Sequence, residues 1–232
     1  MSVQFASKKF KNVFLNYAFE VMVIFLGISI SFWFDEWREN RKDREMERKH
    51  LIDLKNNLKQ DTLLLSHLIK GGNTFVNSSR KLATFKSDMD IIDSLNFHID
   101  NATSYLPLKT NQAAYEEIKQ TGHTSLITND TLKMIILQHY TLVVKNGEEW
   151  SEVDKNYTMT QIIPEMSHYF SVVVDTANMV SDAQKIKALR LQKLRNILLN
   201  NTAYKQAATD VFKTTKIYSE RLIKRIEDEL IK

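Results

Sequence analysis

The sequence predicts an all-α protein in which a single N-terminal transmembrane helix continues into a long stalk helix and an elongated antiparallel helical bundle. A long apolar run lies close to the N-terminus, and apolar residues recur every three or four positions over much of the remainder. The 232 residues include only five Gly and two Pro, which leaves little material for the tight turns of a sheet. The predicted parts are a basic tail (1–12), the transmembrane helix (13–36), the stalk helix (37–70) and the bundle domain (71–232).

The predicted span rests on the apolar run of residues 13–34, VFLNYAFEVMVIFLGISISFWF, in which Glu20 is the one charged residue. As a helix this run is about 33 Å long, enough for a hydrocarbon core of about 30 Å. A cleaved signal peptide is the alternative, because an uncharged run follows three lysines. Cleavage needs small residues after the apolar run, and aromatic residues stand there instead. We therefore expect an uncleaved anchor.

Polar and aromatic residues in and beside this run suggest how it sits in a bilayer. Aromatic side chains at both ends are placed as interfacial anchors. These anchors are Tyr17, Trp33 and Trp37, and they shift the expected span to roughly residues 17–36. Glu20 would lie about one turn inside, where it either reaches the headgroups or contacts another membrane helix. Gly27 and Ser31 form a small-xxx-small pair that allows close helix approach, so we expect the membrane helix contact at Glu20, Gly27 and Ser31.

Basic residues lie on both sides of the run, and two rules for the membrane orientation of such a span give opposite predictions. A count of Lys and Arg favours a cytoplasmic C-terminal side. Export of a tail with three lysines, however, would work against the membrane potential, and the basic residues after the run are offset by acids. We expect an inner (cytoplasmic) membrane protein with its C-terminal domain in the periplasm.

After the run, the absence of Gly and Pro from 35 to 68 predicts the stalk helix, and its second half carries an apolar seam. The seam consists of Leu51, Leu54, Leu58, Leu65 and Leu68, with Asp61 at the remaining position. Gly71-Gly72 is expected to end this helix. Further helices are predicted at 74–96, 111–121 up to Gly122, from an Asn129 N-cap onward, 181–199 and 202–231. Pro164 predicts a kink or a helix start, and 169–174 is either a short strand or buried helix.

Two blocks of residues resemble a known family. The first is Phe19-Glu20-Val21, Gly27, residues 35–39 (DEWRE) and Arg41-Lys42; the second is residues 114–119 (AYEEIK), Gly122, Leu126-Ile127 and Asn129. Together they resemble an uncharacterised family of single-span membrane proteins found widely in Bacteroidota. The chain departs from the family pattern at Phe19 and at Asp35-Glu36. The resemblance implies an N-terminal anchor with a helical domain and assigns no activity.

Several patterns in the sequence resemble parts of catalytic or metal sites. Glu47 with His50 and Glu165 with His168 form two Glu-x-x-His pairs, a motif of di-iron bundles. His50 belongs to a highly charged segment, so we expect a solvated histidine there and no metal. His123, close to Glu116 and Glu117, is expected to cap a helix end. The chain has no cysteine, and its interleaved charges are not those of a nucleic-acid-binding surface. We expect no enzyme activity, no cofactor and no nucleic-acid partner.

The segment containing Tyr115, Gly122 and Asn129 has two interpretations: a corner that fills the core, or a turn that binds a partner. The function expected overall is a non-enzymatic scaffold or accessory subunit of an envelope complex. Its partners would be the lipid bilayer and either a second copy (a homo-oligomer) or another membrane protein. The alternative is a sensory or ligand-binding extracytoplasmic bundle, which a cavity with converging polar groups would favour.

Overall fold

The computed structural model describes the backbone of residues 3–170 and 180–231, and the side chains of Tyr17, 19–170 and 180–231. Every regular element in these ranges is helical, so the all-α prediction is confirmed. The α-helices are α1 (Val3–Thr84), α2 (Leu95–Ala102), α3 (Ala113–Gln120), α4 (Asp130–Gln138), α5 (Lys145–Tyr157), α6 (Ile163–Tyr169), α7 (Asp182–Leu189) and α8 (Gln192–Leu230). Short 3₁₀ turns are η1 (Asp88–Asp90), η2 (Ile92–Ser94) and η3 (His123–Leu126), and π-helical turns are η4 (His139–Val144) and η5 (Thr158–Ile162).

The chain divides into two compact units, residues 1–49 and residues 50–232. The boundary lies inside the predicted stalk (37–70), because the leucine seam of that segment is buried in the second unit. Leu51, Leu54, Leu58 and Leu65 are at most 2% exposed. The second unit is a helical bundle, and the first unit contains the N-terminal part of α1. The basic tail (1–12) lies outside the residues whose side chains are described.

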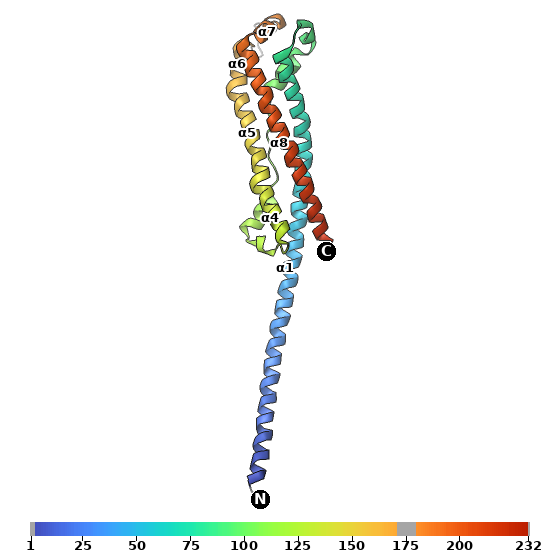
Figure 1. The fold of residues 1–232 in the computed structure, drawn as a ribbon, viewed down its shortest axis with the longest axis vertical. Helices are drawn as coiled ribbons and strands as arrows, with labels where there is room; N and C mark the ends of the chain where they lie inside the picture. The colour runs from blue at the N-terminus through green and yellow to red at the C-terminus, as the bar shows by residue number, and fades with distance from the viewer. Residues whose placement is uncertain (1–2, 171–179, 232) are drawn as a thin grey trace. The chain divides into compact units, whose positions relative to one another are not determined.

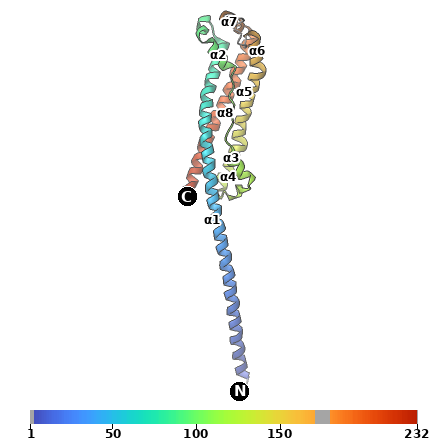
Figure 2. The same ribbon diagram turned by 180° about the vertical axis from the view of Figure 1, so that it is seen from behind.

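Three long rods form the bundle: α1 from residue 50, the run α4–η4–α5–η5–α6, and α8 (Figure 1, Figure 2). Contacts between α1 and α8 pair Lys59 with Glu227 and Ser79 with Asn201, so these two helices are antiparallel. The contact of His139 with Ser219 and the contact of Asp154 with Lys205 show that the α4–α6 rod is also antiparallel to α8. The rods α1 and α4–α6 therefore run in the same direction, which differs from the fully antiparallel bundle that was predicted.

Two parallel rods require a return connection, and residues 103–112 provide it. This segment, the return segment, has no helix or strand, and it runs along the bundle beside α1 and α5. Glycines leave space for it: Leu106 lies over Gly72 of α1, and Leu108 lies over Gly147 of α5. A methyl group on Gly72 would also overlap the Thr209 hydroxyl of α8. The predicted helix end at Gly71-Gly72 is wrong, because these glycines permit close packing inside α1.

Other boundaries also differ from the prediction. The predicted helix 74–96 is split between the end of α1, two 3₁₀ turns and the start of α2. The predicted helix 181–199 is divided between α7 and the start of α8, and α8 continues without a break through the helix predicted at 202–231. Asn129 caps α4 as predicted, with its side-chain oxygen accepting the Leu132 N–H at 3.1 Å. Pro164 lies in the first turn of α6, directly after a π-helical turn. In the run 169–174, Tyr169 ends α6, and 171–174 lie outside the described residues.

The apolar interior of the bundle consists of three clusters along its length. The first surrounds Leu54, Tyr115 and Ile226, the second Leu65 and Phe212, and the third Leu82 and Leu198. On α8 the buried face contains Phe212 and Ser219, whereas Tyr218 is 46% exposed. Buried polar residues separate the clusters: Asp61 lies between Leu58 and Leu65 along α1, and Lys205 lies between Leu198 and Ala208 along α8.

Candidate functional site

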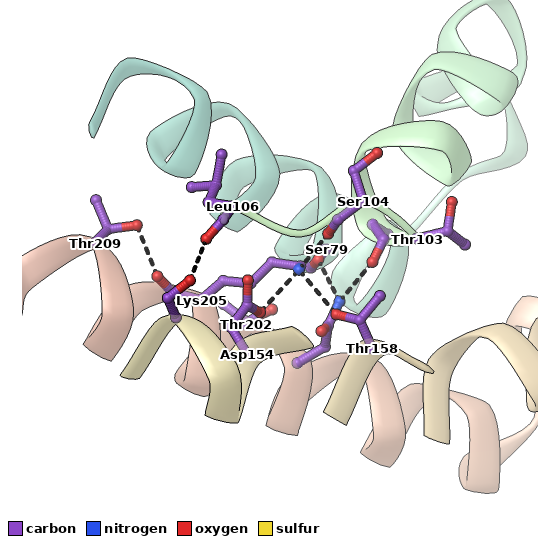
Figure 3. Close-up of polar contacts among 12 residues, drawn as sticks. Ser79, Thr103, Ser104, Leu106, Asp154, Thr158, Thr202, Lys205 and Thr209 are labelled. Carbon is purple, nitrogen blue, oxygen red and sulfur yellow. Dashed lines mark hydrogen bonds and ion pairs between the residues drawn. The ribbon is translucent and has the colours of Figure 1, made fainter. Parts of the chain in front are cut away.

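A network of buried polar contacts in the bundle interior is centred on Lys205 of α8 (Figure 3). Its ammonium group donates to the Ser104 carbonyl at 2.6 Å, to Asp154 Oδ1 at 3.0 Å and to the Thr158 hydroxyl at 3.2 Å. The ring of Phe75 lies 5.6 Å from the same nitrogen. Because an ammonium group has three protons, these three acceptors satisfy it completely. Lys205 is 2% exposed and Asp154 is 1% exposed, so the ion pair is shielded from solvent.

Burial and attraction act in opposite directions on this ion pair. Burial raises the pKa of Asp154 and lowers the pKa of Lys205, whereas their mutual attraction opposes both shifts. The Leu106 N–H also donates to the Asp154 carboxylate and stabilises its charged form. The pair has no net charge whether or not the proton is transferred. All three ammonium protons are used and solvent is excluded, so this ion pair is a structural element with no ammonium proton left to bind a substrate.

Neighbouring side chains extend the same arrangement. Asn201 Nδ2 donates to the Ser79 hydroxyl and to the Ala102 carbonyl, both at 2.9 Å. The Ser151 hydroxyl donates to the Leu106 carbonyl at 2.7 Å and accepts the Leu108 N–H at 2.9 Å. Thus buried side chains of α5 and α8 bind the backbone of the return segment, which has no sheet or helix partner of its own.

A second buried polar group lies closer to the N-terminal end of the bundle. Asp61 Oδ1 accepts the Asn111 N–H at 2.8 Å, and burial raises the pKa of Asp61 to about 6. Burial, together with the nearby Asp61 charge, also raises the pKa of Tyr140, whose ring stacks on Tyr115 with centroids 4.3 Å apart. Asp61 Oδ2, the Tyr140 hydroxyl and Asn57 Nδ2 are buried with no hydrogen-bond partner in the described structure. Asp61 therefore fixes the C-terminal end of the return segment at Asn111, and Lys205 fixes its N-terminal end at Ser104.

The residues predicted as membrane contacts lie on α1 in the first unit. Among the interfacial aromatics, Tyr17 is 65% exposed, Trp33 68% and Trp37 50%. Gly27 has open space around it, and the Ser31 hydroxyl donates to the Gly27 carbonyl at 3.0 Å within the same helix. Ile24, Gly27, Ile28 and Ser31 line a shallow depression of the helix surface. Glu20 is exposed. In the part of the chain that the structure describes, no helix combines the length and the apolar character needed to cross a bilayer.

The turn predicted to bind a partner packs largely against its own chain. Tyr115 is 6% exposed in the core, and Asn129 donates to Glu229 of α8 at 2.6 Å while it caps α4. Gly122 adopts the left-handed conformation with φ of 74°, which suits glycine at the end of α3. These contacts match the interpretation of this segment as a core-filling corner.

The histidines differ most from expectation. The prediction of a solvated His50 is wrong: it is 3% exposed, and its Nε2 lies 2.9 Å from His123 Nδ1. The Glu165–His168 pair does not converge, since Glu165 binds Lys193 at 2.7 Å and His168 is exposed. The described residues contain no group of three or more His, Asp or Glu side chains arranged to hold a metal ion.

Sequence reasoning missed the Lys205 centre. A signal was present, since Asn201, Lys205, Ala208 and Phe212 share one face of a helix at spacings of three and four. A lysine on an otherwise buried face requires an acidic partner, but the sequence does not identify Asp154, which is 51 residues away.

Comparisons with protein-family models, with curated proteins and with solved structures gave no match for this chain. The resemblance to the Bacteroidota family stays a prediction.

Proposed function

We propose that this chain is a non-enzymatic, single-pass membrane scaffold or accessory subunit, anchored by residues 13–36 and presenting the bundle on one side of the membrane. The observation that carries the proposal is a continuous sleeve of exposed apolar side chains on α1, the apolar sleeve. It consists of Phe19, Val21, Met22, Val23, Ile24, Phe25, Leu26, Ile28, Ile30, Phe32, Trp33, Phe34 and Trp37, each at least 50% exposed.

The distribution of the sleeve matters more than its size. Consecutive residues from 21 to 26 are all apolar and exposed, so they cover every side of the helix. A helix that is apolar all round is normally buried in protein or lipid. Residues 19–34 extend about 24 Å, which is short of a hydrocarbon core of about 30 Å. The proposed span therefore also uses the apolar residues at 13–18 of the sequence.

The proposed partner surface within the membrane is the depression at Gly27 and Ser31. Small residues allow the backbones of two helices to approach closely, and the Ser31 hydroxyl is already satisfied by the Gly27 carbonyl. The leucine seam cannot add to this contact while the bundle is folded, because its side chains are buried in their own chain. We therefore place self-association, or binding to another membrane protein, in the anchor and the residues just after it.

Membrane insertion is tested by the double variant Ile24→Arg/Ile28→Arg in the full chain. Each replacement costs about 3–4 kcal/mol at the centre of a bilayer, so the variant should leave the membrane fraction on flotation with vesicles. The matched control is Leu63→Arg/Leu142→Arg, which changes two exposed apolar residues of the bundle. Equal flotation of wild type and the Ile24/Ile28 variant would contradict the anchor.

Self-association and orientation need separate measurements. Gly27→Leu should reduce crosslinking between copies in mild detergent, whereas Met22→Leu on the opposite side of the helix should not. A strictly monomeric wild type would remove the proposed homo-oligomer and leave another membrane protein as the partner.

The proposed orientation has the anchor in the inner membrane and the bundle in the periplasm. It predicts that a phosphatase reporter fused after Lys232 is active. Activity of a cytosolic reporter alone would reverse the orientation.

A further inference from the structure

A cleft between α8 and the α4–η4 segment is independent of the anchor, since all its lining residues belong to the second unit. Its volume is about 250 Å³. Its aliphatic lining residues are Ile135 and Val143 of the α4–η4 segment and Leu222 of α8, which are together called the aliphatic wall. The polar lining residues are Gln138, His139, Tyr218, Arg221 and Arg225. The described lining thus combines two guanidinium groups with apolar surface and contains no carboxylate.

The two arginines are one helical turn apart on α8, and neither forms an ion pair in the described structure. Two like charges at i and i+4 repel each other, so their placement destabilises α8 when no anion is bound between them. Arg221 lies over the Tyr218 ring, 5.8 Å from its centroid, which restricts where the guanidinium group can point. An anion between the two guanidinium groups would remove the repulsion and accept several charge-assisted hydrogen bonds.

His139 supplies a second, independent indication of a ligand. It lines the cleft and is 3% exposed, and its Nδ1 has no hydrogen-bond partner in the described structure, while Nε2 lies 3.4 Å from the Ser219 hydroxyl. Burial lowers the pKa of His139 to about 4, so the ring is neutral at pH 7. His139 also begins the π-helical turn η4, an irregularity found frequently at functional sites.

We propose that this cleft binds a phosphate group carried on a short apolar moiety, with the phosphate at Arg221 and Arg225 and the apolar part against the aliphatic wall. A phosphate monoester has a charge of about −1.5 to −2 at pH 7, which matches two guanidinium groups better than a carboxylate does. The cleft holds about eight water-sized groups at roughly 30 Å³ each, so the ligand is small or only its end is bound. This site would add ligand binding to the proposed scaffold.

The test is calorimetric titration of the full chain, held in phosphatidylcholine nanodiscs, with phenyl phosphate. We expect binding that weakens by ten- to a hundred-fold in Arg221→Gln/Arg225→Gln, because each guanidinium contributes charge-assisted hydrogen bonds. The control Lys213→Gln/Lys224→Gln removes the same two charges from α8 outside the cleft and should bind as wild type does. Benzoate and inorganic phosphate should each bind more weakly than phenyl phosphate.

Further arms identify the source of the phosphate. If a lipid headgroup occupies the cleft, phosphatidylglycerol in the nanodisc should weaken phenyl phosphate binding to wild type; if a free organic phosphate is the ligand, the affinity should stay unchanged. Equal affinity of the double arginine variant and wild type would overturn the proposal. The proposal would also be overturned if phenyl phosphate gave wild type neither a heat of binding nor a chemical-shift change of the His139 ring. Neither result would bear on the anchor, which flotation tests separately.

Discussion

Replacement of Lys205 by Met should strongly destabilise the bundle. Methionine keeps most of the side-chain volume and removes the three hydrogen bonds of the ammonium group to Ser104, Asp154 and Thr158. The Asp154 carboxylate then stays 1% exposed with no counter-charge. Breaking a buried ion pair by removal of one partner costs about 3–5 kcal/mol. Since a domain of this size has a free energy of unfolding of about 5–15 kcal/mol, Lys205→Met should remove a large fraction of it.

Thermal unfolding followed by circular dichroism measures this effect. At about 2–4 °C per kcal/mol, the midpoint should fall by about 6–20 °C. Lys213→Met is the matched control, because Lys213 on the same helix forms an exposed pair with Asp210 and should contribute less than 1 kcal/mol. The double variant Lys205→Met/Asp154→Leu should recover much of the loss, since it leaves no buried charge.

The pH dependence provides a further check. In Lys205→Met the folded-state pKa of Asp154 lies above its unfolded value, so the folded form binds a proton more tightly than the unfolded chain. The free energy of unfolding must then rise as the pH falls through that range, relative to wild type. A loss of under 1 kcal/mol, or a loss that Asp154→Leu makes worse, would refute the account of Lys205 as an obligatory partner of Asp154.

Three other predictions concern the bundle. Burial raises the pKa of Asp61 from 3.8 to about 6, so the folded chain binds a proton at this carboxyl group more tightly than the unfolded chain does. In urea unfolding, the free energy of unfolding of wild type should therefore rise by about 1.4 kcal/mol relative to that of Asp61→Asn between pH 8 and pH 5. Gly72→Ala should lower stability by about 1–3 kcal/mol through overlap with Thr209, whereas Gly71→Ala should be close to neutral. Asn129→Ala should cost about 1 kcal/mol by removing the α4 cap.

Local chemistry made some features predictable from the sequence. The composition and the apolar periodicity predicted an all-α chain, and Asn129 and Gly122 were recognisable as helix start and stop signals because they act through neighbouring backbone groups. The same reasoning failed at Gly71-Gly72. A glycine pair that ends a helix and a glycine pair that admits another segment look identical until the neighbouring segment is known.

Features that depend on distant partners were not predictable. His50 was assigned to solvent from its charged neighbours along the chain, but the 3₁₀ turn that places His123 against it is 73 residues away. The direction of the α4–α6 rod depended on recognising that residues 103–112 cross the bundle as an extended segment. That conformation has no periodic signature, because side chains of other helices satisfy its backbone.

The placement of these buried polar residues explains why the bundle has one register. Leucine-rich helices can slide past each other with little change in apolar burial, so apolar clusters alone specify a helical register weakly. Lys205 and Asp61 each bind one backbone group of the return segment and Ser151 binds two, and a shift of this segment by one residue would break these contacts. The buried polar residues therefore cost desolvation but fix the return segment, and through it the parallel arrangement of α1 and the α4–α6 rod. That arrangement in turn places η4 against α8, where the cleft with Arg221 and Arg225 is formed.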